Sequence, residues 1–383
     1  MKSLSYMILF LSVLAVACTS CKKPYAPPAI KVDNKFLVID GVLVNSIDSP
    51  TVFTLSRTVR LTDSTTSSSP EPGALVSIEG NTGEIFNLSE YPNGIYKADH
   101  LVLNSTNQYR LKIITSPGGE YASDFVEVKQ TQPIDSVRWE QHNDVFIYLY
   151  SHDPTNNSRY YRWDFTETWQ YRARLESELG VSNGLMYYVV RQPDDQKYNC
   201  WGTDNATDLL LGSTAVLSQD VVNKAPIAVV PQNSVKINVR YSILVKQYAI
   251  TDKAYQYLQI LKKNTENLGS LFDAQPTQLL GNIHSLTNPS EIVIGYLTAS
   301  SVQQKRIFIN KDEVTQWNYI YPGRTCDEQK VIDQNPTNYL LYNYPDTGYA
   351  PYFFAGTTGL VINRVSCLDC TLQGGVNKKP SYW

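Results

Sequence analysis

The sequence has 383 residues, and its 33 basic and 36 acidic side chains give a formal net charge of −3. Because this balance provides no basic field for a nucleic-acid backbone, we exclude nucleic acid as a partner. A chain of this length suits two or three domains, since one domain usually spans about 100–200 residues. Only 18% of the residues are charged, whereas 27 are tyrosine, a balance typical of exported β-rich proteins.

The first part of the chain, residues 1–21, is predicted to be a lipoprotein signal peptide. Lys2 precedes an apolar run over residues 7–17, which is too short to span a bilayer. Cys18 and Cys21 each follow a small residue, as a lipidated cysteine does. We predict lipidation of Cys21, with Cys18 as the alternative. Because two or more acyl chains give stable membrane attachment, the mature protein is expected to be lipid-anchored.

A proline-rich tether and then a β domain are expected to follow. Residues 22–34 contain several prolines, which disfavour a helix and cannot pair within a central strand. This segment should therefore be stiff and extended. Residues 35–130 consist of short β-branched and aromatic runs separated by turn residues. This pattern predicts an N-terminal Ig-like or transthyretin-like β-sandwich. Residues 62–72 (TDSTTSSSPEP) lack apolar side chains and are predicted to form a loop.

Residues 131–383 are predicted to form a second β-rich, fibronectin-like domain. Apolar alternation is strongest over residues 234–250 (SVKINVRYSILVKQYAI). One α-helix is expected near residues 252–268, with Thr251 and Gly269 at its cap positions. Its apolar face should pack on a sheet. The C-terminal part is expected to be irregular and held by disulfides, so the predicted fold class is mostly β with one packed helix.

Four cysteines follow the signal segment, and an exported chain favours their oxidation to disulfides. Four cysteines allow three pairings, and the sequence does not choose among them. The Cys-x-x-Cys spacing also fits a redox or zinc site, but no second close pair exists and we expect no helix beside it. Structural disulfides are therefore the favoured interpretation. The four residues are Cys200, Cys326, Cys367 and Cys370.

The candidate ligand surface is an aromatic and acidic group at Trp163, Asp164, Glu167 and Trp169. Indole rings can stack on sugars, and carboxylates can bind their hydroxyl groups. A glycosidase would need two carboxyl groups on either side of one bond, about 5–10 Å apart. Asp164 and Glu167 are three positions apart on a predicted strand, so they should face opposite sides. The alternative interpretation places the aromatic rings in the core and the carboxylates in solvent or ion pairs.

Common catalytic and metal-binding patterns are missing from the sequence. It contains no G-x-S-x-G, H-E-x-x-H, P-loop or G-x-G-x-x-G motif, and its four histidines lack convincing ligand spacing. We therefore expect no enzymatic activity, no metal and no cofactor.

Several segments of the sequence are long enough to be specific. They include CKKPYAPP from Cys21, YYRWDFTETWQY from Tyr160, RYSILVKQYAIT from Arg240 and CLDCTLQGGVNKKPSYW from Cys367. These segments resemble a Bacteroidota outer-membrane lipoprotein family known as domain of unknown function 4249. The resemblance implies an outer-membrane lipoprotein, encoded near a TonB-dependent receptor, that is an accessory or ligand-capturing component of uptake. Its implied partners are that receptor, the membrane and an unidentified ligand. It implies no catalytic residues.

Other functions stay open at this point. A carbohydrate-binding or hydrolytic envelope protein is the first alternative, and a structural or adhesion module is the second. The basic Lys22 and Lys23 follow Cys21, where some surface-exported lipoproteins carry acidic residues, so the side of the membrane also stays open.

Overall fold

The computed structural model describes residues 36–59, 69–181, 188–266, 281–321, 326–327, 329–333, 348–356 and 359–383. Within them the chain is mostly β with one long helix, which confirms the predicted fold class. The predicted signal peptide and tether, and most of the predicted loop at residues 62–72, lie outside the described residues.

Two sheets of short strands form an N-terminal sandwich. The first sheet contains β1 (Leu37–Asn45), β2 (Thr51–Arg57), β3 (Ser69–Pro70), β6 (Ser89–Tyr91) and β7 (Ile95–Ala98). The second contains β4 (Leu75–Gly80), β5 (Ile85–Asn87), β8 (Gln108–Ile114), β9 (Glu120–Ser123) and β10 (Val126–Lys129). Alternate side chains face inward, so Phe53 and Leu55 are buried while Thr54 between them is exposed. A shared apolar core joins the two sheets.

The end of the predicted loop is ordered as a strand. Ser69 and Pro70 form β3, which pairs antiparallel with Arg57 and Ser56 of β2. The next residue, Glu71, accepts a hydrogen bond from Arg57 Nε at 2.7 Å. This ion pair is mostly buried and holds the segment against β2. Loop composition did not reveal it, because pairing at a sheet edge needs few apolar side chains.

A distant segment completes the N-terminal core. Strand β20 (Ile283–Ser285) pairs antiparallel with β9, and β21 (Val293–Ile294) pairs parallel with β1. Ile283, Val293 and Leu297 are buried in the same apolar cluster as the N-terminal strands. The core that begins at residue 37 is therefore finished by residues near 290.

One strand belongs to both halves of the described chain. At its start, Ala299 of β22 (Ala299–Asn310) lies opposite both Leu43 of β1 and Val128 of β10, in parallel pairings. From Val302 onward β22 pairs antiparallel with β19 (Arg240–Ala249). Hydrogen bonding thus continues from the N-terminal sandwich into the second.

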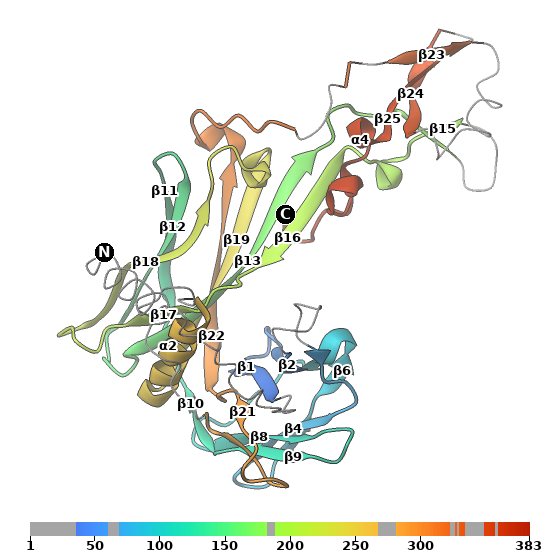
Figure 1. Cartoon of the computed structure of the whole chain (residues 1–383). Helices are drawn as coiled ribbons and strands as arrows, with labels where there is room; N and C mark the ends of the chain where they lie inside the picture. Colours follow the sequence, from blue (N-terminus) through green and yellow to red (C-terminus); the bar gives the residue numbers. More distant parts are fainter. Residues whose placement is uncertain are drawn as a thin grey trace, which may run out of the picture. The chain divides into compact units, whose positions relative to one another are not determined.

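The second sandwich has a three-stranded sheet facing a larger one. The smaller sheet contains β11 (Ile134–Gln141), β12 (Val145–Asp153) and β18 (Asp220–Val230). The larger contains β13 (Tyr160–Arg172), β16 (Asn199–Asn205), β17 (Leu210–Ser213), β19 and β22. Figure 1 shows β13, β16, β19 and β22 side by side. Apolar side chains fill the space between the two sheets.

Helix α2 (Asp252–Glu266) packs where β1 meets the larger sheet. Its first turn is capped as predicted, since Thr251 Oγ1 accepts a hydrogen bond from the backbone N–H of Ala254 at 3.2 Å. Ala254 and Leu258 are buried in a cluster with Val44. The expected cap at Gly269 lies outside the described residues. The helix buries one face because its apolar residues recur at helical spacing.

Part of the C-terminal segment, which we expected to be irregular, forms a sheet. It contains β23 (Lys330–Asp333), β24 (Tyr349–Ala355) and β25 (Gly359–Arg364). A hairpin of β14 (Leu179–Val181) and β15 (Tyr188–Val190) contributes Leu179 to its small core. The short 3-10 helices η1 (Pro92–Gly94), η2 (Pro193–Asp195), η3 (Val235–Ile237) and η4 (Lys311–Glu313) connect other strands.

Two disulfides connect the C-terminal segment to distant residues. Cys200 of β16 bonds Cys370 at the start of η5 (Cys370–Gln373), and Cys326 bonds Cys367 in α4 (Val365–Leu368). The two cysteines of the Cys-x-x-Cys spacing therefore have different partners and do not form a redox pair. Our expectation that this segment holds no helix was wrong, because two short helical turns carry the cysteines.

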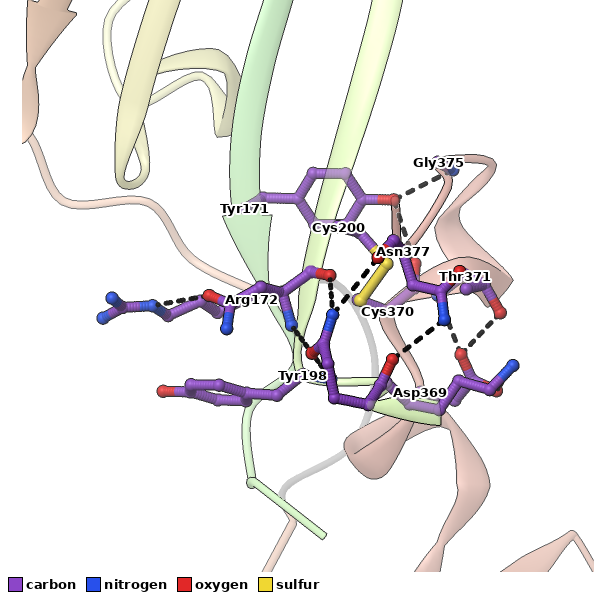
Figure 2. The surroundings of a disulfide bond; sticks show 12 residues. Tyr171, Arg172, Tyr198, Cys200, Asp369, Cys370, Thr371, Gly375 and Asn377 are labelled. Atoms are coloured by element: carbon purple, nitrogen blue, oxygen red, sulfur yellow. Dashed lines mark hydrogen bonds and ion pairs between the residues drawn. A yellow bond between two sulfur atoms is a disulfide. The ribbon is translucent and has the colours of Figure 1, made fainter. Parts of the chain in front are cut away.

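Hydrogen bonds surround the first disulfide (Figure 2). The Tyr171 hydroxyl donates to the Cys370 carbonyl oxygen and accepts from the Gly375 N–H, each at 2.9 Å. The Asp369 carboxylate accepts from the Thr371 N–H at 2.9 Å, which caps η5. Since Tyr171, Cys200 and Cys370 are buried together, the C-terminal turn is an integral part of this end of the sheet.

Candidate functional site

The four residues of the predicted ligand surface do not form one exposed face. Trp163 is buried in the core of the second sandwich, where its Nε1 donates to Gln247 Oε1 at 2.8 Å. Glu167 is also buried, with 4% of its surface exposed. Trp169 is partly buried against the same core. These three odd-numbered positions share one face of β13, and Asp164 lies on the other.

Glu167 is held in a closed network on the inner face of β13. It forms an ion pair with Lys236 Nζ and accepts a hydrogen bond from the Tyr241 hydroxyl at 2.5 Å. Burial, followed by the nearby Glu167 carboxylate, raises the pKa of Tyr241 well above its usual value. The Lys236 ammonium also lies 5.0 Å from the centre of the Trp169 ring. These contacts occupy Glu167 and give it a role in packing.

Asp164 and Glu167 point to opposite faces of β13, as their spacing predicts. Asp164 lines a cleft with Tyr248, whereas Glu167 contacts Tyr241 in the core. A glycosidase pair must flank one bond from a shared space. These two carboxylates have no shared space, so they cannot act as such a pair.

The outer face of β13 forms one wall of a polar cleft of about 350 Å³. Strands β1 and β2 form the opposite side, and β19 continues the wall beyond β13. This volume lies within the roughly 300–1,000 Å³ typical of small-molecule sites. Its lining includes Asp40, Val44, Arg162, Asp164, Lys246 and Tyr248. The cleft therefore lies where the N-terminal sandwich meets the larger sheet of the second.

A mostly buried cation lies in the cleft beside an exposed carboxylate. Arg162 Nη2 is 3.4 Å from Asp40 Oδ1, and the two side chains are 14% and 72% exposed. Such a long, half-exposed ion pair contributes little to stability. The Arg162 guanidinium is therefore fixed in place while its partner is free to exchange with other anions.

A carboxylate lies next to that cation on the same strand face. The Tyr248 side chain lies beside Asp164, and burial followed by the Asp164 charge raises the pKa of Tyr248. Lys246 is the cross-strand neighbour of Asp164 in β19. Among the described residues, no ammonium or guanidinium group lies within 4.0 Å of the Asp164 carboxylate. The cleft thus contains two cations, Arg162 and Lys246, and two carboxylates, Asp40 and Asp164, and of these Arg162 and Asp164 lie two positions apart on one strand.

Sequence reasoning found Asp164 but missed the site around it. Strand alternation indicates that Arg162 and Asp164 share a face. Asp40 and Tyr248 come from strands far away in the sequence, and no local pattern links them to β13. The register of β13 with β19, which places Lys246 opposite Asp164, is likewise a tertiary feature.

A second hollow of about 420 Å³ lies between β17 and β18. Its lining is mainly apolar, and its two lysines are directed elsewhere. Lys224 Nζ pairs with Glu140 at 2.7 Å, and Lys262 Nζ donates to the Leu209 carbonyl oxygen at 2.5 Å. The cleft at Arg162 and Asp164 therefore offers the more specific polar recognition.

One histidine, His152, lies beside a carboxylate. His152 Nδ1 lies 2.8 Å from Asp135 Oδ2, and this hydrogen bond raises the pKa of His152 above its usual value. Across the residues that the structure describes, no group of three or more His, Cys, Asp or Glu side chains is placed to bind a metal ion. Within the same residues, none of the helices has the length and apolar character needed to cross a bilayer.

The fold and site define a mostly β, disulfide-linked protein with a polar cleft between two sandwiches. The chain belongs to the family described as Domain of unknown function (DUF4249), which matches residues 22–306. A search of curated proteins gave no match.

Among solved structures, the chain is similar to the adhesin InvE of Yersinia pseudotuberculosis, with 9% identity and a TM-score of 0.15. The match covers 86% of this chain and 73% of that one. A TM-score this low carries no argument about function.

Proposed function

We propose that this protein is a lipid-anchored outer-membrane protein that captures a small ligand for a TonB-dependent receptor. The observation that carries the proposal is the polar cleft, in which Arg162 and Asp164 are fixed on a strand and line a volume of about 350 Å³. A concave site with a few oriented charges at a junction between two sandwiches suits small-molecule binding. The receptor and the outer membrane are what the family resemblance implies.

Disulfide pairing supports the proposed anchor. All four cysteines after residue 21 are bonded to one another, as Cys200–Cys370 and Cys326–Cys367. None of these four therefore requires Cys18 or Cys21 as a partner, which is compatible with acylation of either. Oxidised cysteines also suit a compartment outside the cytosol.

Lipidation can be tested with radiolabelled palmitate in cells that express single alanine variants. We expect Cys21→Ala to abolish incorporation of the label and Cys18→Ala to retain it, because one acylated thiol is the whole anchor. The reverse result would move the anchor to Cys18. Label that persists in the Cys18→Ala/Cys21→Ala double variant would contradict the proposed anchor.

Partnership with a receptor can be tested by affinity purification from detergent-solubilised outer membranes. We expect the tagged full-length protein to co-purify with a β-barrel TonB-dependent receptor. An unrelated tagged lipoprotein from the same membrane is the control and should not retain this receptor. Failure to recover any receptor, under conditions that preserve a known receptor complex, would contradict the proposed function.

A further inference from the structure

We propose that the cleft binds a small zwitterion, most specifically a peptide of two or three residues with free termini. The proposal rests on the proposed function, because it names the class of ligand that this site would capture. The ligand carboxylate would bind Arg162, and its ammonium group would bind Asp164.

Arg162 is suited to bind a carboxylate. Its side chain is only 14% exposed, and its partner Asp40 is 72% exposed at 3.4 Å. A bidentate carboxylate on a guanidinium forms two charge-assisted hydrogen bonds, which are stronger than this single long contact. A ligand carboxylate can therefore displace Asp40 without leaving a buried charge unpaired, because Asp40 is already in solvent.

Asp164 is suited to bind an ammonium group. Its carboxylate lies in the cleft beside the Tyr248 hydroxyl, and carboxylate oxygens can accept several hydrogen bonds from an ammonium group. No cationic side chain of the described chain occupies it within 4.0 Å. Tyr248 is buried, so the hydroxyl group beside Asp164 belongs to a side chain with little freedom to move.

The backbone positions of Arg162 and Asp164 are spaced like those of a short peptide. Arg162 and Asp164 are two positions apart on one strand face, a rise of about 7 Å. Two residues of an extended peptide span about the same distance. Val42, Val44 and Val52 line the other side of the cleft and provide an apolar surface for small side chains. A polar ligand with no charge would form no ion pair with Arg162 or Asp164.

Binding can be measured by calorimetry on the full lipidated chain in detergent, with Ala-Ala and Ala-Ala-Ala as probes. We expect both peptides to bind. We expect N-acetyl-Ala-Ala and Ala-Ala-amide each to bind about tenfold more weakly or worse, since each has lost one charge-assisted contact. Equal affinity for free and blocked peptides would overturn the proposal. So would the absence of binding by either free peptide at about 10 millimolar, a concentration that detects even weak affinity.

Two variants assign the two ends of the ligand. Arg162→Gln should remove the preference for Ala-Ala over its amide, and Asp164→Asn should remove the preference over the N-acetyl form. A loss of stability alone would not produce this crossed pattern. Arg172→Gln is the matched control, because Arg172 lies on the same strand outside the cleft and contacts Asn199. Retained preference in both cleft variants would contradict the assignment.

Asp40→Asn provides a variant with little risk to folding, since Asp40 is exposed. It removes the carboxylate that competes for Arg162, so Ala-Ala should bind several-fold more tightly. Weaker binding would contradict the displacement step. If no peptide binds while the receptor still co-purifies, the ligand class is wrong and the proposed function stands. If the peptides bind but no receptor co-purifies, the ligand class is correct and the proposed partnership with a receptor is wrong.

Discussion

Replacing both Cys200 and Cys370 by alanine is expected to lower the free energy of unfolding by about 5 kcal/mol. The disulfide joins residues separated by 170 positions, and a cross-link that closes a longer loop removes more entropy from the unfolded chain. The variant also releases the turn that Tyr171 holds through the Cys370 carbonyl oxygen. Equilibrium unfolding in urea, followed by tryptophan fluorescence, measures the change.

The second disulfide provides the matched control. Cys326 and Cys367 are separated by 41 positions, so the Cys326→Ala/Cys367→Ala variant should lose about 4 kcal/mol, less than the first pair. A Cys200→Ala/Cys370→Ala protein that unfolds within about 1 kcal/mol of the unmodified protein would contradict the expected role of the longer cross-link.

Lys236→Met is expected to lower the free energy of unfolding by about 3 kcal/mol, because it leaves a buried carboxylate without its cation. The Glu167 side chain is 6% exposed, and Lys236 forms its ion pair while Tyr241 donates a hydrogen bond. Methionine keeps the apolar stem of the lysine, so the change isolates the charge. Urea unfolding at neutral pH measures the effect.

Two further variants separate charge from packing. Adding Glu167→Gln to Lys236→Met should recover part of the loss, since a neutral amide is less costly to bury than an unpaired carboxylate. Lys224→Met breaks the exposed pair with Glu140 and should cost about 1 kcal/mol or less. If Lys236→Met and Lys224→Met lowered the free energy of unfolding by the same small amount, the buried pair of Lys236 and Glu167 would not be stabilising.

Local patterns in the sequence predicted local structure well. Short β-branched and aromatic runs over residues 35–130 predicted the strands of the first sandwich, and helical spacing predicted a helix near residues 252–268, where α2 spans Asp252–Glu266. These patterns work because each residue's face depends on the period of its own backbone. For the same reason, the spacing of Asp164 and Glu167 correctly placed them on opposite faces of one strand.

Long-range pairing was beyond these patterns. The sequence left the cysteine pairing open among three choices, and it did not indicate that Ala299 pairs with Leu43 and Val128. Periodicity identifies which side of a strand is buried, but not which strand lies beside it. The cleft was missed for this reason, since its charges come from β1, β13 and β19 together.

The division into domains at residues 35–130 and 131–383 stays a prediction. The apolar clusters of the two sandwiches are distinct, but the first cluster contains Ile283 and Val293 from the later part of the chain. Sequence reasoning drew the boundary from composition, which cannot detect a core completed from a distance.

The strand shared by the two sandwiches determines the order in which the molecule can mature. Ribosomes supply residues 37–129 early, yet Leu297 and Ala299, which close that core, emerge only after most of the second sandwich. The apolar core of the first sandwich therefore stays incomplete while the later strands are synthesised. We therefore expect this core to close only when β22 pairs with β1 and β10, and its apolar side chains to favour aggregation until then.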